Sequence, residues 1–240
     1  MPNDSDLPLL GICAPRVDGA IQSESREIFE NRVRLTVEAL GLEKMEMAHY
    51  KAAIERIPAV VDKLAASGAQ AIAINGTSLT FSFGRKFDDG LIAQITGRTG
   101  LPVTTMANSL VRGLKVLKAK RVAVATAYTE DVTNLLCKFL DEHDIQAERP
   151  EFMGITAMDM SGVTRQQLVD LSEQAMKNRK VDALVIACGG LRTRDLTVEM
   201  EAGFGVPVVS SAPAAVWGAL RLVGVNDPVP DAGQLFQLPA

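Results

Sequence analysis

An internal repeat constrains the fold of this chain more than any other feature, because the second half restates the pattern of the first. Residues 73–79 (AINGTSL) align with residues 185–191 (VIACGGL), an offset of 112 positions (188 − 76). Each segment is an apolar run that breaks into small or hydroxyl residues, as a buried strand does where it ends in a loop. Residues 100–105 and 205–210 form a second pair that shares the pattern Gly-x-Pro-Val. The repeat therefore predicts two similar half-molecules.

Strand-like and helix-like patterns alternate along both halves. The apolar runs predict strands at residues 9–14, 42–47, 69–75, 102–105, 120–126, 147–152, 183–187 and 206–209. The amphipathic and capped stretches predict helices at residues 27–39, 52–67, 87–97, 109–117, 129–142, 164–178, 196–202 and 214–223. Near-continuous apolar strands that alternate with helices are typical of parallel sheets covered on both faces.

We therefore expect an α/β fold of two pseudo-symmetric lobes, each a mainly parallel sheet flanked by helices, with the functional site in the cleft between them. One lobe is expected to comprise residues 1–118 and 206–240, with a crossover of the chain between lobes, and the other residues 119–205.

Composition excludes several classes of partner. The net charge is −4 with both signs mixed along the chain, so no basic stripe predicts nucleic-acid binding. Apolar runs are too short to span a bilayer, which predicts no membrane partner, and the polar, acidic N-terminus is unlike a secretory signal. Three widely spaced cysteines fit a reducing compartment, so we expect a cytoplasmic protein.

The sequence also predicts neither a metal nor a cofactor. The two histidines, His49 and His143, lie far apart and match no metal-ligand spacing. The chain contains no glycine-rich phosphate loop of the Walker or dinucleotide-binding type.

Residues able to carry chemistry follow the predicted strands at the points where these end. In parallel sheets, ligands bind beyond the carboxyl ends of the strands, where such residues converge. The residues in question are Gly76, Thr77, Ser78, Tyr128, Cys188 and Gly189.

Cys188 is the candidate for proton transfer. It precedes Gly189 and Gly190, whose amides can approach a ligand closely. We expect these amides to lower the pKa of the thiol, so that it exchanges protons near neutrality. The alternative is a small apolar residue that packs at a strand end, which is the interpretation favoured for Cys13 and Cys137. At the equivalent step of the other half stands Gly76, so one side presents a thiol and the other presents none.

Hydroxyl residues beside these strand ends predict an anion site. Thr77 and Ser78 offer two hydroxyls and free amides, although a Ser/Thr turn or helix cap has the same composition. Tyr128 can donate to an oxyanion or simply pack half-buried. Arg16 aligns with Tyr128 at the repeat offset and either binds a carboxylate or lies on the surface after Pro15.

These segments together resemble the aspartate/glutamate racemase superfamily and, within it, the arylmalonate decarboxylase family. The resemblance rests on residues 76–79 (GTSL), 122–128 (VAVATAY), 188–191 (CGGL) and 205–211 (GVPVVSS) and runs over nearly the whole chain. Racemases and maleate isomerases of the superfamily carry a cysteine on both lobes, whereas the decarboxylases carry glycine on the first lobe, as Gly76 does here.

The resemblance implies cofactor-independent decarboxylation of a disubstituted aryl or alkenyl malonate to a single enantiomer of the monocarboxylic acid. Cys188 would protonate an enediolate, and one carboxylate would be held by Thr77, Ser78, Tyr128 and the amide of Gly189. The implied substrate pocket comprises Pro15, Arg16, Leu42, Met45, Tyr50, Gly76 and Met158. Arg16 stands where the family has a proline, and a guanidinium at the cleft suits a more polar substrate. Met45, Met158 and Ser161 also differ from the apolar pocket residues of the family.

Two alternatives stay open at this point. A racemase or maleate cis-trans isomerase would need Thr77 or a water in place of its second thiol. A carboxylate-binding protein would keep the anion site and have lost the reaction. The expected partner is a small-molecule dicarboxylate, and the sequence pattern specifies no oligomeric state.

Overall fold

The computed structural model describes residues 6–158 and 160–239, and within these the strands form two four-stranded sheets. In chain order, the first half contains β1 (Leu9–Arg16), α1 (Ser23–Phe29), β2 (Arg34–Leu42), α2 (Met47–Ala66), β3 (Ala71–Ile74), α3 (Thr77–Phe81), α4 (Arg85–Thr99), β4 (Val103–Thr105) and α5 (Met106–Val116). The second half contains β5 (Arg121–Thr126), α6 (Glu130–Asp141), β6 (Gln146–Phe152), α7 (Arg165–Met176), β7 (Ala183–Ala187), α8 (Arg194–Phe204), β8 (Val208–Ser210), α9 (Ser211–Leu222) and a 3₁₀ helix (Gln234–Gln237).

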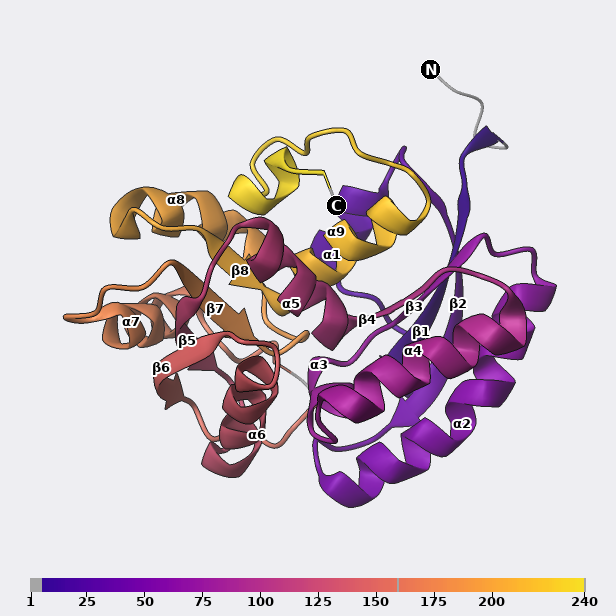
Figure 1. Cartoon of the computed structure of the whole chain (residues 1–240), viewed down its shortest axis with the longest axis horizontal. Coiled ribbons are helices and arrows are strands. Elements are labelled where there is room, and N and C mark those ends of the chain that lie inside the picture. Colours follow the sequence, from indigo (N-terminus) through magenta and orange to yellow (C-terminus); the bar gives the residue numbers. More distant parts are fainter. Residues whose placement is uncertain (1–5, 159, 240) are drawn as a thin grey trace.

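The two sheets have the same topology, which confirms the predicted fold of two α/β lobes (Figure 1). Their strand orders are β2-β1-β3-β4 and β6-β5-β7-β8, and every pairing is parallel. The repeat extends to the register. Leu10 pairs with Ala71 in the first sheet, and Val122 pairs with Ala183 in the second, each residue 112 positions further along the chain (122 − 10 and 183 − 71).

Buried strands explain why this architecture could be expected from the sequence. Every residue of β3 and of β7 is buried, so their apolar runs face covering layers on both sides. On the first lobe, α2 and α4 lie side by side against the sheet (Figure 1). Ile57, Val61 and Leu64 form the fully buried face of α2, spaced at helical intervals. This helix continues through Pro58 to Ala66.

Two expected elements of the first half are wrong. Residues 34–42, expected to be mostly helical, form strand β2, and the helix before it covers only Ser23–Phe29. Asn31 has a left-handed backbone (φ 59°) that separates the two elements, and the β-branched Thr36 and Val37 pair in register with β1. The short strand expected at residues 42–47 is instead the end of β2 and a loop that leads into α2 at Met47.

Helices α5 and α9 form the seam between the lobes (Figure 1). They pack against each other, and each contacts strands of both sheets. All but the last residue of α9 are buried, as expected for a helix that is apolar on all sides. The sequence analysis places residues 206–240 in the first lobe, whereas strand β8 pairs with β7 in the second sheet. The remaining lobe boundaries stay a proposal.

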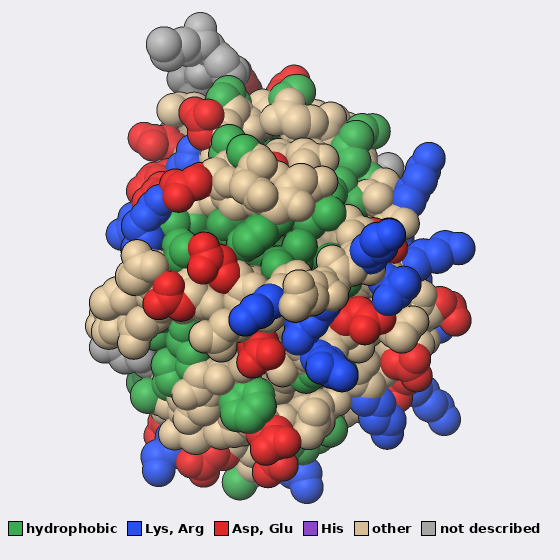
Figure 2. Space-filling view, turned by 90° about the vertical axis from the view of Figure 1, so that its left-hand side faces the viewer, with side chains coloured by type: hydrophobic (Ala, Val, Ile, Leu, Met, Phe, Trp, Pro, Cys, Tyr) green, Lys and Arg blue, Asp and Glu red, His purple; other side chains and the backbone are tan. Residues whose placement is uncertain are grey.

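The surface carries both signs of charge. On the face drawn in Figure 2, acidic and basic side chains are interspersed, with hydrophobic groups between them. None of the helices in the described part of the chain is long and apolar enough to cross a membrane.

Candidate active site

The strand ends of both lobes converge on one cavity. Most of the expected site residues line it, from Pro15 and Arg16 on one lobe to Cys188 and Gly189 on the other. The other expected site residues that line the cavity are Leu42, Met45, Gly76, Thr77, Ser78, Tyr128 and Met158. Gly190 also lines the cavity, next to Gly189, and the sequence interpretation missed the remaining lining residues, Ala20, Ile21, Gln22, Ser25, Asn75, Met106 and Ala212.

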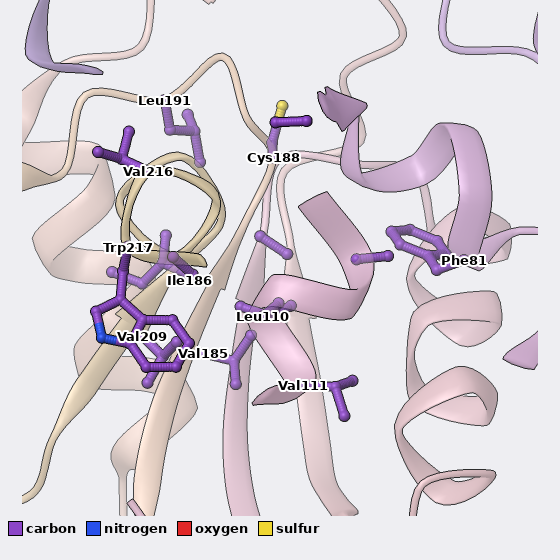
Figure 3. Packing of buried hydrophobic residues seen from close by; sticks show 14 of the residues in the cluster. Phe81, Leu110, Val111, Val185, Ile186, Cys188, Leu191, Val209, Val216 and Trp217 are labelled. Atoms are coloured by element: carbon purple, nitrogen blue, oxygen red, sulfur yellow. The ribbon is translucent and has the colours of Figure 1, made fainter. Parts of the chain in front are cut away.

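Cys188 has an unusual backbone that its repeat partner shares. It follows β7 directly and has a φ of 142°, while Gly76 follows β3 with a φ of 109°. A residue other than glycine is strained in this region, and such strain concentrates at functional positions. Hydrogen bonds hold it in place, since the amide of Cys188 donates to Ser211 Oγ at 3.4 Å and its carbonyl accepts from the amide of Leu191 at 3.2 Å. Figure 3 shows the sulfur directed away from the packed side chains of Val185 and Ile186.

The thiol of Cys188 is protonated at neutral pH, and the expected lowering of its pKa is wrong. Burial raises the pKa of Cys188 to about 11, and the Gly190 amide and the Tyr128 hydroxyl act in the opposite direction with smaller effect. The amides are present as expected, but the loss of water around the sulfur outweighs them. A buried thiol that keeps its proton is suited to donate it.

A cluster of hydroxyls lies beside the thiol. Thr77 and Ser78 open the short helix α3, which the sequence interpretation treated as a loop, and Gly76 precedes it in a left-handed conformation. Tyr50 lies behind Ser78 and donates to its Oγ at 2.8 Å, so the hydrogen of Ser78 is left for another acceptor. Burial raises the pKa of Tyr128 well above its usual value, and the hydroxyls of Thr77 and Ser78 beside it act in the opposite direction. All these groups are therefore neutral donors at physiological pH.

Met106 joins the two lobes at the floor of this cluster. The hydroxyl of Thr77 donates to Met106 Sδ at 3.0 Å. A Cβ added to Gly189 would lie 2.8 Å from the same sulfur, so the close approach requires glycine at this position. The repeat could have predicted that Met106 lies at the site, because Met106 and Ser211, which bonds Cys188, are each the first residue after the last strand of their sheet.

The rest of the wall is mostly apolar. Leu42 and Met45 are buried and line the cavity together with Met158. At the mouth, Arg16 forms a bidentate ion pair with Asp18, with Nε–Oδ1 and Nη2–Oδ2 distances of 3.1 and 3.0 Å. This hydrogen-bonded partner lowers the pKa of Asp18 to about 2. The guanidinium charge is thus matched by a carboxylate next to the cavity.

Neither other cysteine lines the cavity. Cys13 is buried in β1, where burial holds its pKa far above the usual value, and Cys137 lies on α6. Within the described residues, no three His, Cys, Asp or Glu side chains come together in a group that could hold a metal ion.

Two α/β lobes that place a cysteine and a hydroxyl cluster at facing strand ends define a member of the aspartate/glutamate racemase superfamily. Within that class, the chain belongs to the arylmalonate decarboxylase family, whose sequence profile matches residues 10–236. It is 35% identical over 235 residues to the arylmalonate decarboxylase of Bordetella bronchiseptica, covering 97% of this chain and 98% of that protein.

Solved structures agree with this assignment. A double mutant of arylmalonate decarboxylase in its liganded form superposes with a TM-score of 0.91 at 34% identity, covering 96% of this chain and 99% of that chain. Maleate isomerase of Pseudomonas putida is a more distant relative, 28% identical over 222 residues, with 90% of this chain and 86% of that protein covered.

Proposed function

We propose that this protein is a cofactor-independent decarboxylase of disubstituted malonates, with aryl or alkenyl substituents, and that it releases one enantiomer of the monocarboxylic acid. The observation that carries this proposal is the asymmetry of the cleft. A protonated thiol at Cys188 faces Gly76 across the repeat, beside the hydroxyls of Thr77, Ser78 and Tyr128. Family membership and the likeness to arylmalonate decarboxylase support the same reaction.

In the proposed ground state, one substrate carboxylate accepts hydrogen bonds from the cluster. Thr77, Ser78 and Tyr128 supply hydroxyl donors, and Gly189 supplies an amide that its missing side chain leaves accessible. To donate to the substrate, the Thr77 hydroxyl exchanges the Met106 sulfur, a weak acceptor, for a carboxylate oxygen. These donors are already in place, so they stabilise the charge that develops on the oxygens as the reaction proceeds.

The second carboxylate is the leaving group. We assign it to the apolar wall of Leu42, Met45 and Met158, together with Pro15, where few donors compensate its charge. Such surroundings favour its loss as neutral carbon dioxide. The bond between this carboxylate and the α-carbon breaks, and its electron pair passes into an enediolate held by the hydroxyl cluster.

Protonation completes the reaction. The S–H bond of Cys188 breaks, its proton goes to the α-carbon, and the thiolate later recovers a proton from water. The net reaction consumes one proton and releases one carbon dioxide. Because Gly76 offers no thiol on the opposite face, the proton arrives from one side and the product is a single enantiomer. The proposal needs no metal or organic cofactor, its partner is the small dicarboxylate, and a cytoplasmic location fits it.

The test is carbon dioxide release from a panel of substituted malonates, in the presence of a chelator and without added cofactor. We expect turnover of aryl-substituted malonates with high enantiomeric excess. Maleate and single-enantiomer 2-aryl acids serve as parallel substrates. Isomerisation or racemisation without decarboxylation would replace the proposal by one of the two alternative enzymes, and binding without any turnover would indicate a carboxylate-binding protein.

A further inference from the structure

A buried carboxylate of the first lobe holds the loop that carries the thiol of the second. Glu24 lies on α1 and is only 3% exposed. Its Oε2 accepts hydrogen bonds from the amides of Thr193 at 2.9 Å and Arg194 at 3.0 Å, across 169 and 170 positions of sequence. These amides open α8, and Cys188 lies five residues before Thr193 (193 − 188).

Glu24 supplies the cap that α8 does not provide for itself. The N-cap residue of α8 is Thr193, and in the described structure its side chain makes no capping hydrogen bond. A carboxylate at a helix N-terminus satisfies free amides and interacts favourably with the helix dipole. Here the carboxylate comes from the opposite lobe, so the cap also ties the lobes together at the cleft.

Two further contacts reinforce the tie. Gln22 donates from Nε2 to the carbonyl of Leu191 at 3.4 Å, and Arg194 pairs with Glu27 at 2.8 Å. The segment between Cys188 and Arg194 is thus bonded to the first lobe at its middle and at its end. This restraint matters because two glycines follow Cys188 and leave the loop intrinsically flexible.

A second carboxylate makes a comparable contact in the opposite direction, from the second lobe to a helix of the first. Glu142, after α6, accepts from the amide of Arg85 at 2.6 Å and so caps α4, whose N-cap residue Gly84 has no side chain. Helices α1 and α6 are equivalent in the repeat, as are α4 and α8. Glu142 holds the lobe that carries Gly76 rather than the thiol, and it is partly exposed.

We propose that Glu24 is a positioning residue for Cys188. Glu24 holds the loop of Cys188 closed over the cleft, so that the proton of the Cys188 thiol reaches one face of the intermediate. The inference rests on the proposed function for its kinetic readout. Its structural content, that the loop opens when Glu24 is changed, can be tested without any substrate.

The experiment compares Glu24→Gln and Glu24→Ala with Glu142→Gln as the matched control. Glutamine keeps the shape of Glu24 but weakens the two charge-assisted bonds, so we expect kcat to fall about 10-fold, and about 100-fold for alanine. KM should rise much less than kcat falls, because only the Gly189 amide lies on the loop, and the Thr77, Ser78 and Tyr128 hydroxyls that bind the same carboxylate lie outside it. The enantiomeric excess of the product should fall with kcat, a change that a purely structural role would not cause. Glu142→Gln should change neither.

A second measurement follows alkylation of Cys188 by iodoacetamide, mapped by peptide mass spectrometry. In Glu24→Gln we expect alkylation to be about 5-fold faster or more than in Glu142→Gln, because local opening exposes the thiol. Equal alkylation rates and equal enantiomeric excess in the two folded variants would overturn the inference. If the protein decarboxylates no malonate, the alkylation ratio alone decides it, so failure of the proposed function and failure of the inference remain separate results. If Glu24→Ala does not fold, the glutamine variant decides the comparison.

Discussion

At the scale of single residues, the proposed reaction depends on groups that keep their protons. Cys188, Tyr128 and Tyr50 all have raised pKa values, in each case mainly through burial. A neutral cluster can bind a carboxylate as donor without first being charged, and a protonated thiol can act as acid without a partner base.

Replacing Cys188 by alanine tests the role of the thiol. We expect decarboxylation to fall by ~10²–10⁴-fold or more, since a positioned proton donor is lost. The backbone at this position is strained for any side chain, so removal of the sulfur should leave the fold and the binding of a product acid nearly unchanged. Circular dichroism and ligand titration provide the controls. A variant that kept most of its rate would exclude Cys188 as the proton donor.

Replacing Tyr128 by phenylalanine tests the hydroxyl cluster. The ring of Tyr128 packs edge-on against Phe81 at a centroid distance of 5.7 Å, a contact that phenylalanine preserves. We therefore expect little change in thermal stability. The rate should fall by ~10²–10³-fold, about 2.7–4 kcal/mol of transition-state stabilisation for one lost donor. Kinetics equal to those of the parent protein would assign Tyr128 to packing alone.

At the scale of elements, a second buried carboxylate joins α4 to the start of α5. Asp88, on α4, is fully buried, and its Oδ1 accepts from Thr105 Oγ1 at 2.7 Å. The same Thr105 oxygen accepts from the amide of Asn108 and caps α5. Burial raises the pKa of Asp88 to about 6, while Thr105 and Thr80, on α3, act in the opposite direction.

This raised pKa predicts a distinct dependence of stability on pH. Between the ordinary value of 3.8 and about 6, the folded protein binds this proton more tightly than the unfolded chain does. Stability should therefore fall as the pH rises through that window, by up to about 3 kcal/mol, and the loss should be absent in Asp88→Asn. Thermal unfolding across this range measures it, with the exposed neighbour Asp89→Asn as control. Parallel pH profiles of Asp88→Asn and the parent protein would contradict the prediction.

The elements that the sequence predicted well are those whose environment is uniform. Strands β3 and β7 are buried on both faces and therefore read as plain apolar runs. Strand β2 is half-buried along most of its length, and its mixed pattern favours the helix predicted at residues 27–39. The predicted lowering of the Cys188 pKa is wrong for a related reason, since desolvation depends on side chains that come from distant parts of the chain. The tie from Glu24 to Thr193 depends on two segments 169 positions apart, which no local pattern contains.

At the scale of the whole molecule, the repeat places Gly76 and Cys188 at equivalent strand ends, with matching left-handed backbones. The two sheets share one register, and of these two positions only Cys188 carries a side chain. If Cys188 donates the proton as proposed, a single substitution at Gly76 would place a second thiol in this architecture.

Replacing Gly76 by cysteine should therefore add a racemising activity. The new thiol would address the face of the enediolate opposite to Cys188, so a proton can leave one face of the product acid and return on the other. The backbone tolerates the change at a cost, because an added Cβ lies 3.2 Å from Leu79 Cβ and 3.4 Å from Pro15 Cβ at a φ of 109°. We expect a loss of stability of about 1–3 kcal/mol.

The measurement follows the optical purity of a single-enantiomer product incubated with the variant, and Gly76→Ala controls for the added bulk. Racemisation by the cysteine variant alone, together with a lower enantiomeric excess in decarboxylation, is the expected result. The alanine variant should bear the same backbone strain and racemise nothing, which separates the thiol from its Cβ. If a folded and reduced Gly76→Cys protein left both optical purities intact, the equivalent strand ends would not face a common intermediate, and the stereochemical role of the missing thiol would have to be given up.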